Sequence, residues 1–155
     1  METTIRDVIR TTGQAVQSVR PDSTVAQALE KMAEHNIGAV LVMGSPDSLS
    51  GIFSERDYAR AAARSGGVDG ATAVSKLMSP ELVTVRPEQT VQQCMVFMTE
   101  RRVRHLPVTD DRGTLVGLVS IGDLVKAAIA EKEYLIAEKQ ALIGKLQDYI
   151  SGTIA

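Results

Sequence analysis

The apolar and polar positions of residues 19–66 follow a pattern that predicts four elements in order. Apolar residues recur with the period of a helix from Val25 to Met32, and Asn36 is a suitable helix end. A continuous apolar run at Gly38 to Met43 is typical of a strand covered on both faces. The run from Leu49 to Phe53 predicts a second strand, and a second helix is expected to begin near Ser54.

The same pattern occurs a second time, 66 positions later. Aligning Val19–Ala63 with Val85–Ile129 needs no gap and leaves 15 identical residues, far more than chance produces. GIFSERD at residues 51–57 thereby matches GLVSIGD at residues 117–123. Further upstream, IRDVI at Ile5 resembles VSKLM at Val74 with a shift of 69. The pattern indicates an internal duplication.

We therefore expect an α/β (α+β) fold made of two β-α-β-β-α repeats, each preceded by a short helix. Repeat 1 is assigned to residues 1–66, repeat 2 to residues 67–130, and a C-terminal helical tail to residues 131–155. The glycine-rich stretch RSGGVDG at residues 64–70 separates the repeats. A sheet of about three short strands cannot cover both of its faces, so the repeats must pack on one another.

Composition narrows the function classes. The 155 residues are 44% hydrophobic and 23% charged, and the net charge of −2 provides no basic field for nucleic acid or anionic lipid. The apolar runs are too short to span a membrane, and the N-terminal residues contain no apolar signal core. A single cysteine, Cys94, excludes an internal disulfide. We expect a cytoplasmic protein with no nucleic-acid or membrane partner.

The chain resembles a tandem pair of cystathionine β-synthase (CBS) domains, a Bateman module, of the stand-alone bacterial type. The resemblance lies in the duplication, the order of elements and the sequence of both strand-to-helix junctions. RVRHLPV at residues 102–108 followed by GLVSIGD is close to the commonest form of the family. The resemblance covers residues 1–130. It implies two repeats related by pseudo-twofold symmetry, two adenine-nucleotide clefts between them, and association of two modules into a flat disc.

The repeated G-x-x-S-x-x-D figure supports two interpretations. Ser54 with Asp57, and Ser120 with Asp123, have the spacing of helix capping boxes. A helix N-terminus also attracts anions, and a carboxylate in its first turn can hold a ribose diol. The resemblance favours the second interpretation: it implies that Asp57 and Asp123 bind ribose and that Ser54 and Ser120 lie beside them near the phosphate.

The repeats differ in charge at the positions that the resemblance links to phosphate. Arg104 and His105 of repeat 2 stand where repeat 1 has Gly38 and Ala39, and they are the phosphate candidates. Arg56, opposite Gly122 in the alignment, is either a further phosphate ligand or a solvated surface arginine. For adenine, the resemblance points to the segment that precedes each repeat's first helix and to the following strand starts: Val19, Ser23, Thr24, Ile37, Val85, Gln89, Thr90 and Val103.

No arrangement of residues indicates catalysis or metal binding. Cys94 is expected to be a small buried residue, and two histidines without ligand spacing do not make a metal site. The favoured function is a regulatory sensor that binds AMP, ATP or NAD, possesses no enzyme activity and signals to an unidentified partner protein. The alternatives are a structural module with vestigial clefts and a nucleotide-processing enzyme.

The tail carries a helical stripe of apolar residues, interrupted by Lys132 and Lys139: Leu135, Ile136, Leu142, Ile143, Leu146, Tyr149 and Ile150. This face either packs back on its own module or crosses to a second copy. We expect this face to pack on a second copy, and hence a homodimer.

Overall fold

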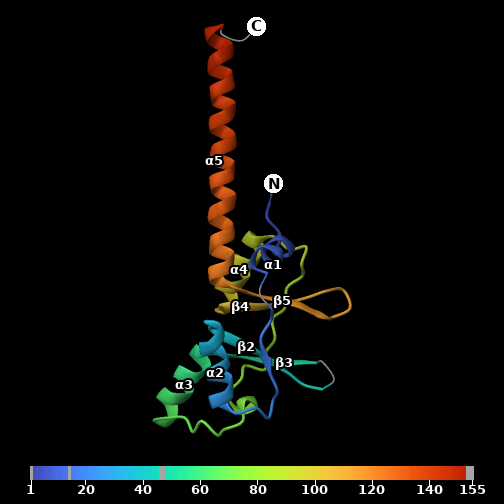
Figure 1. Ribbon diagram of the computed structural model, residues 1–155, viewed down its shortest axis with the longest axis vertical. Coiled ribbons are helices and arrows are strands. Elements are labelled where there is room, and N and C mark those ends of the chain that lie inside the picture. The colour runs from blue at the N-terminus through green and yellow to red at the C-terminus, as the bar shows by residue number, and fades with distance from the viewer. Residues whose placement is uncertain (1, 14, 46–47, 153–155) are drawn as a thin grey trace.

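The two repeats form two small α/β units that lie one after the other along the molecule, in a computed structural model that describes residues 2–13, 15–45 and 48–152 (Figure 1). The helices are α1 (Ile5–Thr12), α2 (Val25–His35), α3 (Glu55–Ser65), the short 3₁₀ helix η1 (Val74–Lys76), α4 (Val91–Arg101) and α5 (Ile121–Ser151). The strands are β1 (Ser18–Val19), β2 (Ala39–Met43), β3 (Leu49–Ser54), β4 (His105–Thr109) and β5 (Leu115–Ser120).

The strand pairing confirms the duplication. In repeat 1, β2 pairs antiparallel with β3, so that Ala39 faces Ser54. In repeat 2, β4 pairs antiparallel with β5, so that His105 faces Ser120 at the equivalent position. Both hairpins shift register at the same place, after Val42 and after Val108. The two serines that begin the second helix of each repeat therefore lie at matching ends of the two sheets.

The first strand of repeat 2 is shorter than the sequence predicts. In repeat 1, β1 runs parallel to β2, and the Leu41 N–H donates to the Gln17 carbonyl at 3.1 Å. In repeat 2 this strand is reduced to a single bridge between Val85 and Val108. The reason is chemical, because the residue equivalent to Leu41 is Pro107, which has no N–H to donate.

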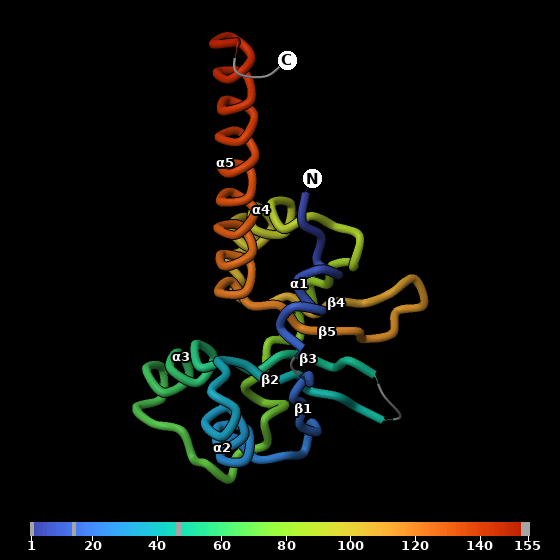
Figure 2. Tube along the Cα trace, turned by 45° about the horizontal axis from the view of Figure 1, so that its top comes forward, coloured from blue at the N-terminus to red at the C-terminus, as the bar shows by residue number. Residues whose placement is uncertain are grey.

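The segments that precede each repeat are exchanged between the two cores. Ile5 and Val8 of α1 are buried in the core of repeat 2, and the Ile5 N–H donates to the Gln89 carbonyl at 2.9 Å. Val74 of η1 is buried in the core of repeat 1, and its N–H donates to the Ser23 carbonyl at 2.7 Å. This exchange links the two repeats, and the segments that follow α1 and η1 pass between one repeat and the other (Figure 2).

The predicted second short helix is only the three-residue η1, and its N-terminus gives the reason. Thr4 and Asp7 form a complete capping box at the start of α1. The equivalent positions are Ala73 and Lys76, and no side chain caps η1. Without that cap, one turn of 3₁₀ helix forms.

Candidate functional site

Two clefts lie between the repeats, and each takes residues from both. Cleft A is lined by Gly38, Ile52, Ser54, Glu55, Arg56, Asp57, Arg60, Ser79, Glu81, Leu82, Val83, Arg102, Val103, Arg104, His105 and Pro107. Cleft B is lined by Thr12, Ala15, Val16, Gln17, Asn36, Ile37, Gly38, Ala39, His105, Leu118, Ser120, Asp123 and Lys126.

The two clefts are equivalent under the internal duplication. Ser54, Asp57 and Arg60 of cleft A correspond to Ser120, Asp123 and Lys126 of cleft B. The opposite wall is residues 102–105 in cleft A and residues 36–39 in cleft B, again 66 positions apart. Each cleft thus combines the N-terminus of the second helix of one repeat with the strand start of the other.

The capping interpretation of the repeated figure is confirmed at both helices. At α3 the Ser54 N–H donates to Oδ2 of Asp57 at 2.8 Å, and the Asp57 N–H donates to Oγ of Ser54 at 3.3 Å. At α5 the equivalent distances, between Ser120 and Asp123, are 2.9 and 3.1 Å. Each box leaves the second carboxylate oxygen, Oδ1, outside the capping contacts.

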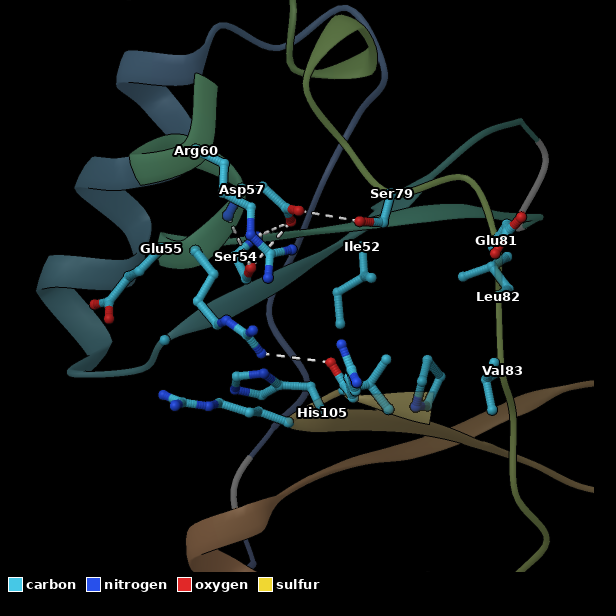
Figure 3. A pocket seen from close by; sticks show the side chains of 16 residues that line it. Ile52, Ser54, Glu55, Asp57, Arg60, Ser79, Glu81, Leu82, Val83 and His105 are labelled. Atoms are coloured by element: carbon cyan, nitrogen blue, oxygen red, sulfur yellow. Dashed lines mark hydrogen bonds between the residues drawn. The ribbon is translucent and has the colours of Figure 1, made fainter. Parts of the chain in front are cut away.

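The second oxygens of the two aspartates differ in their surroundings. The Ser79 hydroxyl, which comes from the segment after η1, donates to Oδ1 of Asp57 at 3.0 Å (Figure 3). Among the described residues, no hydrogen bond reaches Oδ1 of Asp123. A ligand hydroxyl would have to displace or share the Ser79 contact in cleft A, whereas in cleft B the acceptor is open.

Cleft A also holds most of the positive charge. Its lining contains four arginines, at positions 56, 60, 102 and 104, against the carboxylates of Glu55, Asp57 and Glu81. Arg56 reaches across the cleft, where its Nη1 donates to the Arg102 carbonyl at 3.5 Å. The charged residues that line cleft B, apart from His105, are Asp123 and Lys126. The cavity volumes are about 160 Å³ for cleft A and about 350 Å³ for cleft B.

His105 lines both clefts at the centre of the module. A Cβ atom added to Gly38 would lie 3.6 Å from Cε1 of His105, so the ring packs on the glycine backbone of the other repeat. Burial lowers the pKa of the His105 imidazole, and the nearby Arg104 acts in the same direction. The carboxylates of Asp123, Glu55 and Asp57 oppose this change. Charge in either cleft therefore acts on the pKa of this imidazole.

The model of the CBS domain family matches residues 5–64 and 74–130. The chain belongs to the CBS domain family. It is 40% identical over 137 residues to the mitochondrial CBS domain-containing protein CBSX3 of Arabidopsis thaliana, which covers 83% of this chain and 66% of that protein. This chain thus spans about two thirds of the Arabidopsis protein.

Solved structures of the family have the same fold. A CBS-domain containing protein from Agrobacterium tumefaciens superimposes with a TM-score of 0.78 at 38% identity, over 83% of this chain and 95% of that one. CBSX2, solved in complex with AMP, has a TM-score of 0.67 at 25% identity, over 84% and 98%. A CBS pair at 18% identity, which shares the fold with a TM-score of 0.73 over 84% and 99%, was solved with 5-methylthioadenosine and S-adenosyl-L-methionine.

The structure gathers the predicted polar residues of this CBS pair but not all of the predicted adenine residues. Ser54, Arg56, Asp57, Arg104 and His105 line cleft A together, and Ser120 and Asp123 line cleft B with His105. Of the eight residues proposed for adenine, Val103 lines cleft A and Ile37 lines cleft B.

The other six line neither cleft. Val19 and Ser23 line a separate open hollow beside α2. Thr24 and Thr90 cap α2 and α4 through their side chains, and Oε1 of Gln89 accepts the Arg86 N–H at 2.8 Å. Val85 is buried in the core of repeat 2.

Sequence reasoning missed the third wall of each cleft. In cleft A this wall is Ser79 and the segment from Glu81 to Val83, and in cleft B it is Thr12 and the segment from Ala15 to Gln17. Both walls follow the exchanged segments α1 and η1. The available signal was the main alignment, because carrying its shift of 66 back from Val19 sets Ala15–Gln17 opposite Glu81–Val83.

The described residues contain no group of three or more His, Cys, Asp or Glu that could hold a metal ion. No helix among them has the length and apolar character needed to cross a bilayer. Cys94 is buried, and burial raises the pKa of its thiol to about 11, so the side chain is a packing residue of the repeat 2 core.

Proposed function

We propose that this CBS pair is a regulatory sensor that binds adenine nucleotides in clefts A and B and passes its ligand state to a partner protein. The supporting observation is the pair of equivalent clefts, each with an aspartate in the first turn of a helix and the strand start of the other repeat facing it. AMP in the structure of the relative CBSX2 supports the same class of ligand.

In this proposal Asp57 and Asp123 each accept hydrogen bonds from a ribose diol through Oδ1. Ile37 and Val103 provide apolar surface for adenine at the opposite wall, in clefts B and A respectively. Ser54 and Ser120 hold the aspartates in place through the capping boxes. The helix N-termini add the partial positive charge that suits a phosphate.

The clefts are proposed to prefer different ligands. Arginine forms charge-assisted, bidentate contacts with phosphate, so cleft A with its four arginines suits AMP or ATP. Cleft B has one lysine and about twice the volume, which suits a ligand whose bulk exceeds its charge, such as NAD or S-adenosylmethionine. Ligands such as these close the gap between the repeats, and the change of shape is the signal.

Asp123 joins cleft B to helix α5, which we propose as the signalling element. It lies in the first turn of α5, which continues without a break to Ser151. A ligand that engages Asp123 therefore acts on the base of a long helix that extends away from the module (Figure 1). We propose that this helix, in a homodimer of the chain, relays the ligand state.

One observation favours the alternative of a structural module with an unused cleft. Both carboxylate oxygens of Asp57 already have partners within the chain, through Ser54 and Ser79. On that alternative cleft A would bind nothing, and the arginines would balance Glu55 and Glu81.

Thermal unfolding with AMP, ATP, NAD and S-adenosylmethionine tests the proposal. A ligand at 100 times its dissociation constant stabilises the folded state by about 2.7 kcal/mol, and 2′,3′-dideoxy analogues should stabilise it much less. Asp57→Asn and Asp123→Asn should each remove one binding site by calorimetry. Gln93→Ala, which breaks the capping box of α4 outside both clefts, is the control. An unchanged melting temperature with all four ligands at millimolar concentration would refute the sensor.

A further inference from the structure

A groove between α1 and the first turns of α5 continues cleft B along α5. Helix α1 lies beside the base of α5, and the two helices leave a cavity of about 430 Å³, larger than cleft B itself (Figure 1). The groove and cleft B share three lining residues, Thr12, Asp123 and Lys126. The other residues of the groove come from both helices: Thr3, Asp7, Val8, Thr11, Ala127 and Ala130. A ligand in cleft B can therefore extend into the groove.

The junction of cleft B and the groove offers a carboxylate oxygen and an ammonium group to a ligand. Among the described residues, no hydrogen bond reaches Oδ1 of Asp123. Lys126 has no ion pair within the described part of the chain. It follows Asp123 by three residues, so its side chain lies one turn further along the same face of α5. An ammonium group beyond a ribose-binding carboxylate is well placed for the phosphate that follows the ribose.

Beyond this lysine the groove offers apolar surface and a hydrogen-bond acceptor. Val8 is buried and Ala127 and Ala130 are small, so a flat ring has room between the helices. Asp7 uses Oδ2 in the capping box of α1, and no described residue donates to its Oδ1. The hydrogen bonds from Thr4 lower the pKa of the Asp7 carboxyl. This end of the groove therefore suits a neutral or cationic group that carries donors.

The groove has a limited length. From Asp123 to Ala130 helix α5 rises by about 10 Å, at 1.5 Å per residue. At the far end the Thr3 N–H donates to Oε1 of Glu131 at 3.2 Å, which bridges the two walls. The space is therefore suited to one further ring with its sugar.

We infer that cleft B and the groove together bind a dinucleotide, in which a pyrophosphate joins two nucleosides and the second nucleoside is neutral or cationic. The inference rests on the proposed nucleotide function of cleft B. The first ribose binds Asp123 and the pyrophosphate binds Lys126. The second nucleoside lies between α1 and α5 and donates a hydrogen bond to Asp7. A polyphosphate in the groove would bring negative charge beside Asp7, so the groove discriminates against it.

The positions equivalent to the groove beside cleft A have different chemistry. The duplication sets Lys76 opposite Asp7 and Arg64 opposite Ala130. The counterpart of α1 is η1, which has only three residues. Two cations suit further phosphate better than a neutral ring. We therefore expect one dinucleotide site per chain, in cleft B.

A matched series of ligands tests the groove by calorimetry. The full chain carries Asp57→Asn, which silences cleft A. AMP fills cleft B alone, ADP-ribose adds the second phosphate and ribose, and NAD adds the second base. We expect affinity to rise in that order, with NAD at least about 10-fold tighter than AMP because the second nucleoside is covered by the groove. ATP should gain little over AMP.

Tryptophan substitutions separate the groove from cleft B. Ala130→Trp fills the groove, whereas Ala137→Trp places the same side chain about two turns further along α5 and is the control. Ala130→Trp should weaken NAD binding about 10-fold and AMP binding less than about 2-fold. Thr11→Trp, from the α1 wall, should have the same effect. Lys126→Gln should weaken AMP and NAD alike, by about 5-fold, and adenosine much less.

The possible results distinguish this inference from the sensor proposal. The amide resonances of Val8 and Ala127 should shift far more with NAD than with AMP. AMP binding with no gain for NAD, or equal losses of AMP and NAD in Ala130→Trp, would overturn the dinucleotide site and leave the sensor in place. Failure of AMP, ADP-ribose and NAD to bind the native chain would refute the sensor itself.

Discussion

Replacing the glycines of the repeated figure with alanine should destabilise repeat 1 much more than repeat 2. Neither Gly51 nor Gly117 has a positive φ, so the effect depends on space alone. A Cβ on Gly51 would lie 2.7 Å from Sδ of Met78 and 2.9 Å from the Ser79 carbonyl oxygen. A Cβ on Gly117 would lie 2.8 Å from Cδ1 of Ile9, the far end of a flexible side chain.

The two variants should differ in stability because the new Cβ atom displaces a different group in each. The Ser79 carbonyl is fixed by the Ile52 N–H at 3.2 Å, and the Ser79 N–H donates back to Ile52 at 2.9 Å. Overpacking against such a backbone costs about 1–3 kcal/mol, and alanine returns about 0.4–1 kcal/mol through the unfolded chain. We expect Gly51→Ala to lose about 2 kcal/mol and Gly117→Ala about 0–1 kcal/mol, because Ile9 can rotate.

Urea unfolding of the two variants measures the difference. Gly122→Ala is the control, since its Cβ would lie at an ordinary 3.6 Å from Oγ of Ser120 and helix propensity favours alanine. Gly51→Ala should also shift Ser79 and so alter nucleotide affinity in cleft A while leaving cleft B unchanged. Equal losses of unfolding free energy for Gly51→Ala and Gly117→Ala would refute the argument that a fixed backbone carbonyl yields less readily than a flexible side chain.

Three further results are expected. Arg104→Ala should weaken AMP binding by about 12-fold, or about 1.5 kcal/mol since the side chain is exposed, and should weaken adenosine binding much less. If calorimetry shows equal losses for AMP and adenosine, or the same loss for the control Arg112→Ala, Arg104 does not bind phosphate. Ser79→Ala should raise nucleotide affinity in cleft A by freeing Oδ1 of Asp57, and a lower affinity would show that the hydroxyl binds the ligand itself. When the pH is lowered from about 7.5 to 5.5, the melting temperature of the native chain should fall further than that of the His105→Gln variant. Burial lowers the folded-state pKa of His105, so the unfolded chain takes up the proton first and stability falls as the pH drops through about 6.5; identical pH profiles would contradict this.

The sequence was sufficient for the elements that depend on local chemistry. Ser54 and Ser120 cap α3 and α5 as the pattern indicates, and Asn36 ends α2 in the left-handed conformation. The predicted polar residues lie together because the duplication places both figures at matching sheet ends. These features depend on residues a few positions apart.

What could not be predicted depends on contacts between distant segments. The exchange of α1 and η1 between the cores determines the third wall of each cleft, and no local pattern reveals which core a short segment joins. The same exchange sets Gln17 and Val83 in the clefts, whereas the adenine candidates Val19 and Val85, two residues later, line neither. The loss of a strand at Pro107 follows from one absent N–H whose partner lies 24 residues away, at Val83.

The position of Asp123 connects the ligand site with the proposed dimer. A ligand that tilts α5 by about 5° at cleft B would move Tyr149, about 36 Å away, by about 3 Å. In the proposed homodimer the moving part of α5 packs on the second copy. A packed interface resists intermediate positions, so the second α5 should follow the first. We therefore expect ligand binding in cleft B to be cooperative between copies, with a Hill coefficient above 1 for the full chain. Truncation after Ala130 keeps Asp123 and removes the rest of α5, so binding should persist with a Hill coefficient of 1. Cooperative binding by the truncated chain would show that the signal travels by another route.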